Sequence, residues 1–306
     1  MSSKKSNIEL FHNKSRRRLQ IVRIARFITQ LAFLFIANYG LSLAFPLPVI
    51  GLSYPWTSFP SVIDMLQAMI ILLIPPLLPF ASLVFFNVLL GRWFCGWICP
   101  FGFAQDIAAY LFNGKRFISS KTDRTLKNLK YVIMIIVLIT ALAFSSLTLT
   151  GSLDAFEQSY GRGIAIMPYT SFAPDATLFG TIPLLFRLGI LPTFDKLLSS
   201  INAALFVRYF ILVVILVLSA RITRFWCRYA CPMGGLNAIF ASKSILGIYR
   251  NIGKCDECGM CNKVCPVQID VANAKIGRID SKECIMCFEC VAACHTDAIK
   301  IAVKKR

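Results

Sequence analysis

Eight of the twelve cysteines stand in two runs toward the C-terminal end, and the two runs have the same spacing. In each run two residues separate the first three cysteines and three residues precede the fourth, which gives Cys255, Cys258, Cys261 and Cys265 and then Cys284, Cys287, Cys290 and Cys294. Thiolates hold cubane [4Fe–4S] clusters at this spacing, so a segment that carries it twice is expected to fold around two of them. The sequence therefore predicts a small α+β domain with two [4Fe–4S] clusters.

The fourth cysteine of each run is expected to cross to the cluster of the other run. Cluster one then has the ligands Cys255, Cys258, Cys261 and Cys294, and cluster two has Cys265, Cys284, Cys287 and Cys290. Pro266 follows the first run but His295 follows the second, which removes a backbone constraint and no ligand. Structural zinc is the alternative, because C-x2-C is also zinc spacing, yet zinc does not require the three-residue step in both runs.

The rest of the chain has the composition of a membrane protein. Of the 306 residues, 57% are hydrophobic and 16% are charged, against about 45–50% and about 25% in soluble domains. Long apolar stretches predict four spans near the roughly 20 residues that a bilayer requires, at about 21–47, 65–91, 130–150 and 201–221. We expect an all-α polytopic membrane domain over residues 1–240 and a ferredoxin-like domain over residues 241–306.

Two of these stretches have alternative explanations. The first could be a cleaved signal peptide, but it is too long for the apolar region of one, so we expect it to be retained. The second contains Pro75, Pro76 and Pro79. It forms either one kinked span or, as we favour, a short helix over residues 61–74 followed by a span that starts at the prolines.

The basic residues lie in blocks beside the apolar stretches. The net charge of +18 does not come from a stripe interleaved with aromatic residues, so no nucleic acid is expected as a partner. Basic blocks precede the first span and fill residues 115–130, between the second and third spans. This asymmetry predicts that both termini are cytoplasmic. The cysteines then lie where thiols stay reduced, which favours metal ligation over disulfides.

An internal repeat links the two halves of the membrane part. Residues 92–102 (RWFCGWICPFG) correspond to residues 224–234 (RFWCRYACPMG) at a constant offset of 132. Each copy follows the second span of a pair, so two parallel halves related by an axis along the membrane normal are expected. The two C-x3-C-P motifs then bring Cys95, Cys99, Cys227 and Cys231 to the cytoplasmic boundary. If the helix continues past the membrane, each pair shares one helix face.

Two interpretations of these four cysteines compete. Buried structural cysteines are common, because a free cysteine packs as a small hydrophobe. The equal offset and the shared arginine, aromatic and proline neighbours favour a redox or metal role instead. The four thiols could hold a third cluster, a metal ion or a switchable dithiol.

Four spans, two C-x3-C-P motifs and a terminal double ferredoxin run resemble the NapH group, which includes the related NosH proteins. The resemblance implies a quinol dehydrogenase component of the bacterial cytoplasmic membrane, with membrane lipid and the quinone pool around it. It also implies a periplasmic iron–sulfur partner of the NapG type and a nitrate or nitrous oxide reductase or cytochrome. NosR regulators and CcoG-type oxidase assembly proteins share the motif order, so a maturation factor that reduces a metal or thiol site is the alternative function.

Other chemistry has little support in the sequence. No phosphate-binding glycine loop, flavin or nicotinamide fingerprint, or haem-attachment C-x-x-C-H motif occurs, which leaves electron transfer. A quinone site requires an apolar slot with a few polar groups. Asp64, Gln67 and Arg208 lie on the outer side where such a slot is possible, although headgroup contacts explain them equally well. His295 is expected mainly to pack.

Overall fold

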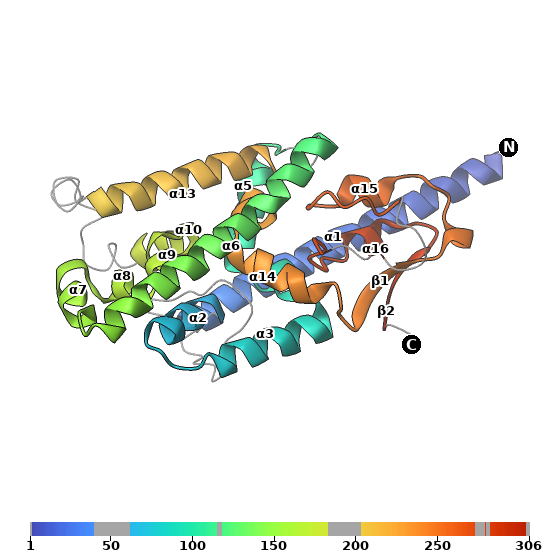
Figure 1. Ribbon diagram of the computed structural model, residues 1–306. Helices are drawn as coiled ribbons and strands as arrows, with labels where there is room; N and C mark the ends of the chain where they lie inside the picture. Colours follow the sequence, from blue (N-terminus) through green and yellow to red (C-terminus); the bar gives the residue numbers. More distant parts are fainter. Residues whose placement is uncertain are drawn as a thin grey trace.

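The structure is a computed structural model, and it describes residues 2–39, 62–114, 118–182, 203–272, 279 and 282–303. Within these residues nearly all regular structure is helical, with one two-stranded sheet. The longer helices form an elongated bundle, and the sheet lies with two short helices at one end of it (Figure 1). This arrangement agrees with a helical part followed by a small α+β unit.

The first helix, α1 (Ser2–Tyr39), connects the two parts of the molecule. It packs against α5 (Pro100–Leu111) in the bundle and against α16 (Glu289–Ala293) in the small unit (Figure 1). The predicted first span is helical as far as Tyr39, and residues 40–47 lie outside the described residues. The basic segment before that span is therefore part of the same helix.

Prolines divide the second apolar stretch into two helices. The first, α2 (Val62–Ile71), ends before Pro75, and α3 (Leu77–Leu90) begins directly after Pro76, its N-cap. Leu73 turns the chain between them with a φ of 57°. The two helices pack on each other, so the structure has a helical hairpin here and not one kinked helix over residues 65–91.

Two of the described helices are long and apolar enough to cross a bilayer, α6 (Ser120–Leu149) and α13 (Ala203–Arg221). Only 11% of the apolar window of α6 and 17% of that of α13 is buried inside the protein. Their apolar side chains thus face outward, as expected in lipid and not in a soluble core. The helices α2 and α3 are apolar but shorter. Four spans and cytoplasmic termini remain predictions.

A series of short helices joins α6 to the end of the described segment at residue 182: α7 (Leu153–Tyr160), α8 (Arg162–Ile166), α9 (Pro168–Phe172), α10 (Pro174–Ala176) and the π-helix η1 (Thr177–Thr181). Thr170 of α9 donates a hydrogen bond of 2.6 Å to Asp64 and accepts one of 3.0 Å from Gln67. Arg208 lies over the ring of Phe172 at 5.6 Å. Helix α9 is therefore connected to its neighbours through the polar side chains of Asp64, Gln67 and Arg208.

The small unit is closed by a two-stranded antiparallel sheet. In it, β1 (Leu246–Arg250) pairs with β2 (Ile299–Val303) so that Leu246 lies opposite Val303. The helices η3 (Ile252–Lys254), α15 (Met260–Val264) and α16 lie between the strands in sequence. The preceding helix, α14 (Pro232–Ala241), ends at the predicted domain boundary.

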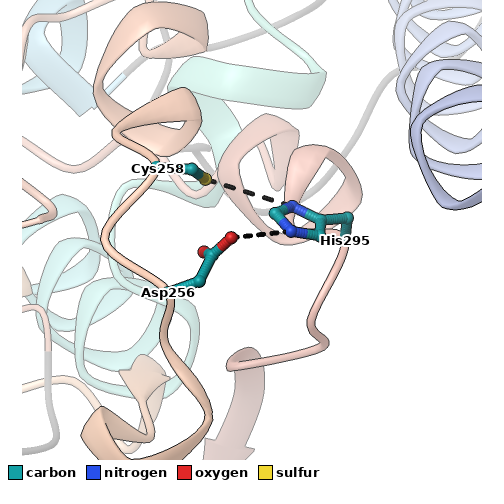
Figure 2. A group of neighbouring side chains, drawn as sticks. All are labelled: Asp256, Cys258 and His295. Carbon is teal, nitrogen blue, oxygen red and sulfur yellow. Dashed lines mark hydrogen bonds and ion pairs between the residues drawn. The ribbon is translucent and has the colours of Figure 1, made fainter. Parts of the chain in front are cut away.

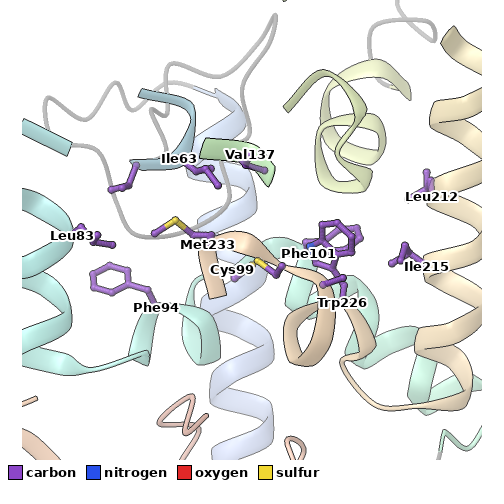
Figure 3. Close-up of a cluster of buried hydrophobic side chains, with 13 residues drawn as sticks. Ile63, Leu83, Phe94, Cys99, Phe101, Val137, Leu212, Ile215, Trp226 and Met233 are labelled. Carbon is purple, nitrogen blue, oxygen red and sulfur yellow. The ribbon is translucent and has the colours of Figure 1, made fainter. Parts of the chain in front are cut away.

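The bundle has a buried apolar core that contains two of the predicted site cysteines, Cys99 and Cys231. Side chains of Leu83, Val137 and Leu212 reach it from α3, α6 and α13, and Cys99 lies among them beside Phe101 (Figure 3). The short elements α4 (Trp93–Trp97) and η2 (Trp226–Ala230) carry the first cysteine of each C-x3-C-P motif. The paired motifs are therefore part of the packing that holds the bundle together.

Candidate iron–sulfur and four-thiol sites

The two ferredoxin runs have the same backbone conformation. Residues with positive φ occur in pairs 29 positions apart, as the cysteines do: Glu257 and Met286, Gly259 and Phe288, Gln268 and Asp297. Gly259 and Phe288 follow the second cysteine of each run in the left-handed region and are the N-caps of α15 and α16. Alternation between left- and right-handed residues turns successive amide groups toward one side, a geometry found at iron–sulfur sites.

Four cysteines from both runs surround one small apolar cavity. They are Cys265, Cys284, Cys287 and Cys290, and isoleucine and valine side chains complete the wall. Burial raises the pKa of Cys287 to about 12, and the Ile269 amide donates a hydrogen bond of 3.4 Å to Cys265. This set is the one predicted for cluster two, including the crossing Cys265. Four thiols within an apolar wall fit a [4Fe–4S] cluster.

The other four cysteines lie nearer the surface. Cys258 is exposed, whereas Cys255, Cys261 and Cys294 are half-buried. Burial raises the pKa of Cys258, and the nearby Asp256 and Cys294 raise it further. Burial also raises the pKa of Cys261, and Cys258 and Cys255 add to that rise. The structure thus brings together the set predicted for cluster one, and it fits a cluster close to solvent.

His295 lies beside the predicted ligands of cluster one, and it makes polar contacts there as well as packing. Its Nε2 is 2.8 Å from Oδ2 of Asp256, and its Nδ1 is 4.0 Å from Sγ of Cys258 (Figure 2). The imidazole therefore interacts both with the carboxylate of Asp256 and with Cys258, a predicted cluster ligand. Groups in such a position orient metal ligands and influence their electron density, so the expectation of a packing role was incomplete.

Each C-x3-C-P motif forms a bend between two helical elements. Cys95 lies in α4 and Cys227 in η2, whereas Cys99 and Cys231 are the N-caps of α5 and α14, outside the helical conformation. The proline after each second cysteine starts the next helix and keeps the residue before it out of the helical region. The prediction that each pair shares the face of one continuous helix is wrong for this reason.

The two motif regions pack on each other's helices. α13 precedes the second motif and packs on α5, which follows the first, while α3 precedes the first motif and packs on α14, which follows the second. Ser219 donates to Gln105 at 3.2 Å in one contact, and Asn87 donates to Asn237 at 2.9 Å in the other. These residues correspond at the offset of 132, so the repeat extends into the contacts between the halves.

The same two amide side chains reach the cysteines. Gln105 Nε2 donates to Sγ of Cys227 at 3.2 Å, and Asn237 Nδ2 donates to Sγ of Cys95 at 3.6 Å. Each half therefore provides a hydrogen bond to the first cysteine of the other half. Burial raises the pKa of Cys99, and the neighbouring Cys227 and Cys95 raise it further.

The pKa values of the two thiols in the second motif, Cys227 and Cys231, are raised as well. Burial raises the pKa of Cys227 to about 11, and Cys95 is near enough to add to the rise. Burial also raises the pKa of Cys231, with contributions from Cys227, Cys95 and Cys99. The four cysteines thus lie near enough to influence one another, and we call this group the four-thiol site. Thiolates are soft ligands that suit iron–sulfur centres and several metal ions. Binding of such a group would require the thiols to deprotonate and would therefore release protons.

Two arginines frame the four-thiol site. Arg92 and Arg224 begin the two copies of the repeat, and both are almost fully buried. A Cβ atom at Gly234 would lie 3.1 Å from Arg92, and one at Gly102 would lie 3.5 Å from Arg224. Each glycine therefore leaves room for the guanidinium of the other half. Arg224 also donates a hydrogen bond of 2.9 Å to the carbonyl of Cys95.

The four-thiol site lies directly against the ferredoxin-like unit. Cys95 packs on a buried group that contains Cys265 and Cys287 of the predicted cluster two. The indole of Trp97 donates a hydrogen bond of 2.9 Å to the carbonyl of Met286. The two predicted redox sites are therefore neighbours, because α4 contacts the second cysteine run directly.

Ion pairs join the same two units. Arg92 binds Glu283 at 3.1 Å, and Lys130 also pairs with Glu283. Arg26 of α1 binds Glu289 of α16 at 2.5 Å. Arg92 and Lys130 were among the basic residues that predicted the membrane orientation, so they have a second role in holding the cysteine-rich unit in place.

We expect Gly96→Ala to weaken this contact. A Cβ atom at Gly96 would lie 2.3 Å from the carbonyl oxygen of Ile285, and relief of such a clash costs about 1–3 kcal/mol. Thermal loss of the iron–sulfur absorbance should therefore begin at a lower temperature than in the wild type. Gly253→Ala is the matched control, because its Cβ atom would meet only Asn251 at 3.5 Å. Equal stability of the two variants would contradict the expectation.

Several residues of these sites were not identified from the sequence. Gln105 and Asn237 correspond at the same offset of 132 but lie just beyond the matching window, so a longer comparison of the halves would have found them. No correspondence between the two halves points to Asp106 or Glu289. Their importance comes from contacts between elements far apart in the sequence.

Two family models match the chain. A 4Fe-4S binding domain matches residues 72–118 and again residues 204–248, segments that begin 132 positions apart. A 4Fe-4S dicluster domain matches residues 247–295. The first model covers both C-x3-C-P motifs, and the second covers both ferredoxin runs.

Curated relatives match most of the chain at modest identity. An uncharacterized protein of Methanocaldococcus jannaschii is 30% identical over 233 residues, which is 73% of this chain and 78% of that protein. A second protein of the same organism is 29% identical, and the match covers 69% of this chain and 65% of that protein. The ferredoxin-type protein NapH of Haemophilus influenzae is 24% identical over 72% of this chain and 66% of its own length. No solved structure matches the chain.

Proposed function

Because the chain belongs to the family of NapH-type, 4Fe-4S ferredoxin-type membrane proteins, we propose that it oxidises a membrane quinol and delivers the electrons to a partner of a respiratory reductase. The observation that carries the proposal is the packing of Cys95 on the cysteines of cluster two. A thiol site between apolar helices and an iron–sulfur domain is well placed to connect the lipid phase with that domain. Each [4Fe–4S] cluster supplies reversible one-electron storage when bound.

The side chains around the sites have distinct tasks in this proposal. Gln105 and Asn237 hold the first cysteine of each C-x3-C-P motif in one orientation. Apolar residues around cluster two exclude water, which strengthens the electrostatic influence of the nearby arginines. The exposed Cys258 marks the part of the cluster sites nearest the surface.

The partner in this proposal is a periplasmic iron–sulfur protein of the NapG type, together with a nitrate or nitrous oxide reductase. The position in the bacterial cytoplasmic membrane, with both termini in the cytoplasm, rests on the basic blocks beside the apolar helices. The ion pairs of Arg92 and Lys130 with Glu283 of the ferredoxin-like unit support a place for that unit on the same side as these blocks.

A maturation factor that transfers metal or reduces thiols is the other candidate. Such a protein must expose its cargo site to the recipient. Cys99, Cys227 and Cys231 are each no more than 5% exposed. This burial favours a resident electron-transfer site over a site for cargo.

Anaerobic purification followed by metal analysis and quinol titration tests the proposal. We expect about eight iron atoms per chain in two cubane clusters, and more if the four-thiol site also binds iron. A soluble naphthoquinol should reduce the clusters, as followed by absorbance and electron paramagnetic resonance. Zinc in place of iron, or clusters that only dithionite reduces, would overturn the proposal.

A further inference from the structure

A cavity of about 630 Å³ lies between α1, α5 and the ferredoxin-like unit. Small-molecule sites are typically about 300–1,000 Å³ and combine apolar walls with a few polar groups. This cavity has that character: its apolar side chains include Phe27, Phe103 and Ile107, and its polar ones include Arg26 and Asp106. Phe27 and Phe103 form an edge-to-face pair with ring centroids 4.9 Å apart.

The mouth of the cavity is apolar. Ile24 and Phe27 on α1 are 58% and 47% exposed, and Tyr110 on α5 is 85% exposed. Leu111 and Phe112, which follow Tyr110 in the chain, are also largely exposed. An apolar patch of this kind is unfavourable in water and is expected at a lipid boundary. A lipid-soluble molecule could therefore enter sideways from the bilayer.

The inner wall is a buried network of charges. Arg26 binds Asp106 at 3.1 Å and Glu289 at 2.5 Å. Asp106 also binds Arg224 at 2.6 Å, and Arg23 binds Glu289 at 2.9 Å. Each arginine thus has a carboxylate partner, so the wall favours a neutral polar headgroup over a phosphate. The side chain of Asp106 keeps 29% exposure.

The network also connects the cavity to both redox sites. Arg26 donates a hydrogen bond of 3.1 Å to the carbonyl of Gly96, between the two cysteines of the first C-x3-C-P motif. Pro266 and Glu289 line the cavity and adjoin Cys265 and Cys290 in the chain. A headgroup in the cavity would therefore lie beside the predicted ligands of cluster two and beside the four-thiol site.

We infer that this cavity is the quinol-binding site, with the headgroup against Asp106 and Arg26 and the isoprenoid tail across the exposed apolar residues of α1 and α5. The inference rests on the proposed function and places its substrate on the ferredoxin side of the bundle, away from Asp64, Gln67 and Arg208. Oxidation of one quinol to the quinone releases two electrons, one to each of two iron–sulfur acceptors, and two protons, which leave for water past the partly exposed Asp106.

Photolabelling and a cavity-filling variant test the inference on the full-length, cluster-loaded protein. An azido-naphthoquinone should label segments 23–30 and 103–114 of the wild type, and excess menadione should suppress the labelling. In Ile107→Trp the larger side chain fills the cavity, so we expect at least tenfold weaker binding of menadione, measured by equilibrium dialysis, and slower reduction by naphthoquinol. Reduction by dithionite should be unchanged, which shows that the clusters are intact.

Ile139→Trp is the matched control, because Ile139 is an exposed apolar residue of α6 that does not line the cavity. Labelling near Asp64 in place of α1 and α5, or equal menadione binding by Ile107→Trp and Ile139→Trp, would overturn the inference and leave the proposed function standing. Labelling of α1 and α5 without reduction of the clusters by naphthoquinol would support the binding site and overturn the proposed function.

Discussion

Replacement of Cys95, Cys99, Cys227 or Cys231 by alanine is expected to abolish reduction of the clusters by quinol. The two halves join at one buried site, where Gln105 and Asn237 each donate a hydrogen bond to a cysteine of the other half. A metal centre that loses one of four ligands loses its geometry. Each single change should therefore lower the rate by about 100-fold or more, and a double change should add little, because residues that act as a unit are non-additive.

The spectra of the two ferredoxin-type clusters should remain nearly unchanged in these variants, because their eight predicted ligands lie elsewhere. Stopped-flow reduction by naphthoquinol measures the rate, and reduction by dithionite reports whether the clusters are present. Val137→Ala is a suitable control, since Val137 belongs to the same buried core as Cys99 and Cys231 but carries no thiol. Rates as fast as those of Val137→Ala in all four cysteine variants would show that these cysteines are structural.

Cys265→Ala should remove cluster two although Cys265 stands in the first cysteine run. Its side chain lines the same cavity as Cys284, Cys287 and Cys290, so the loss of its thiol leaves that set with three ligands. The iron content should fall from about eight atoms per chain to about four. Electron paramagnetic resonance of the reduced protein should retain only the signal of cluster one.

Cys294→Ala provides the reciprocal test. Cys294 stands in the second run, but it lies close enough to Cys258 to influence its pKa. This change should remove cluster one and spare cluster two. If Cys265→Ala instead removes the cluster of Cys255, Cys258 and Cys261, the crossed assignment is wrong.

Local sequence patterns predicted the parts of this molecule that depend on local chemistry. Regular cysteine spacing predicted a ferredoxin-type domain, and the prolines after Ile74 marked the break between α2 and α3. The constant offset of 132 between the two motif copies pointed to Cys95, Cys99, Cys227 and Cys231. The first two signals lie in residues that are close together along the chain, and the third lies in the recurrence of one short motif.

Local sequence patterns could not predict the contacts between elements that are far apart in the chain. The basic residues near the N-terminus predicted membrane orientation, but charge alone does not show that Arg26 finds Glu289, more than 260 residues later. A C-x3-C-P motif fits a helix by spacing, and only the backbone shows that Cys99 and Cys231 cap new helices. The cavity beside Asp106 likewise forms from segments that are far apart in the sequence, and it has no motif of its own.

The exchange of helix contacts between the two halves has a consequence for biogenesis. A ribosome that has completed only the first half has made Cys95 and Cys99, but the amide that binds Cys95 and the helix that covers α5 are still missing. The surroundings of Cys95 are therefore complete only after residue 237 has been synthesised and inserted. Cys95 and Cys99 lack these partners until then, and two halves produced as separate polypeptides should complete each other through the same contacts.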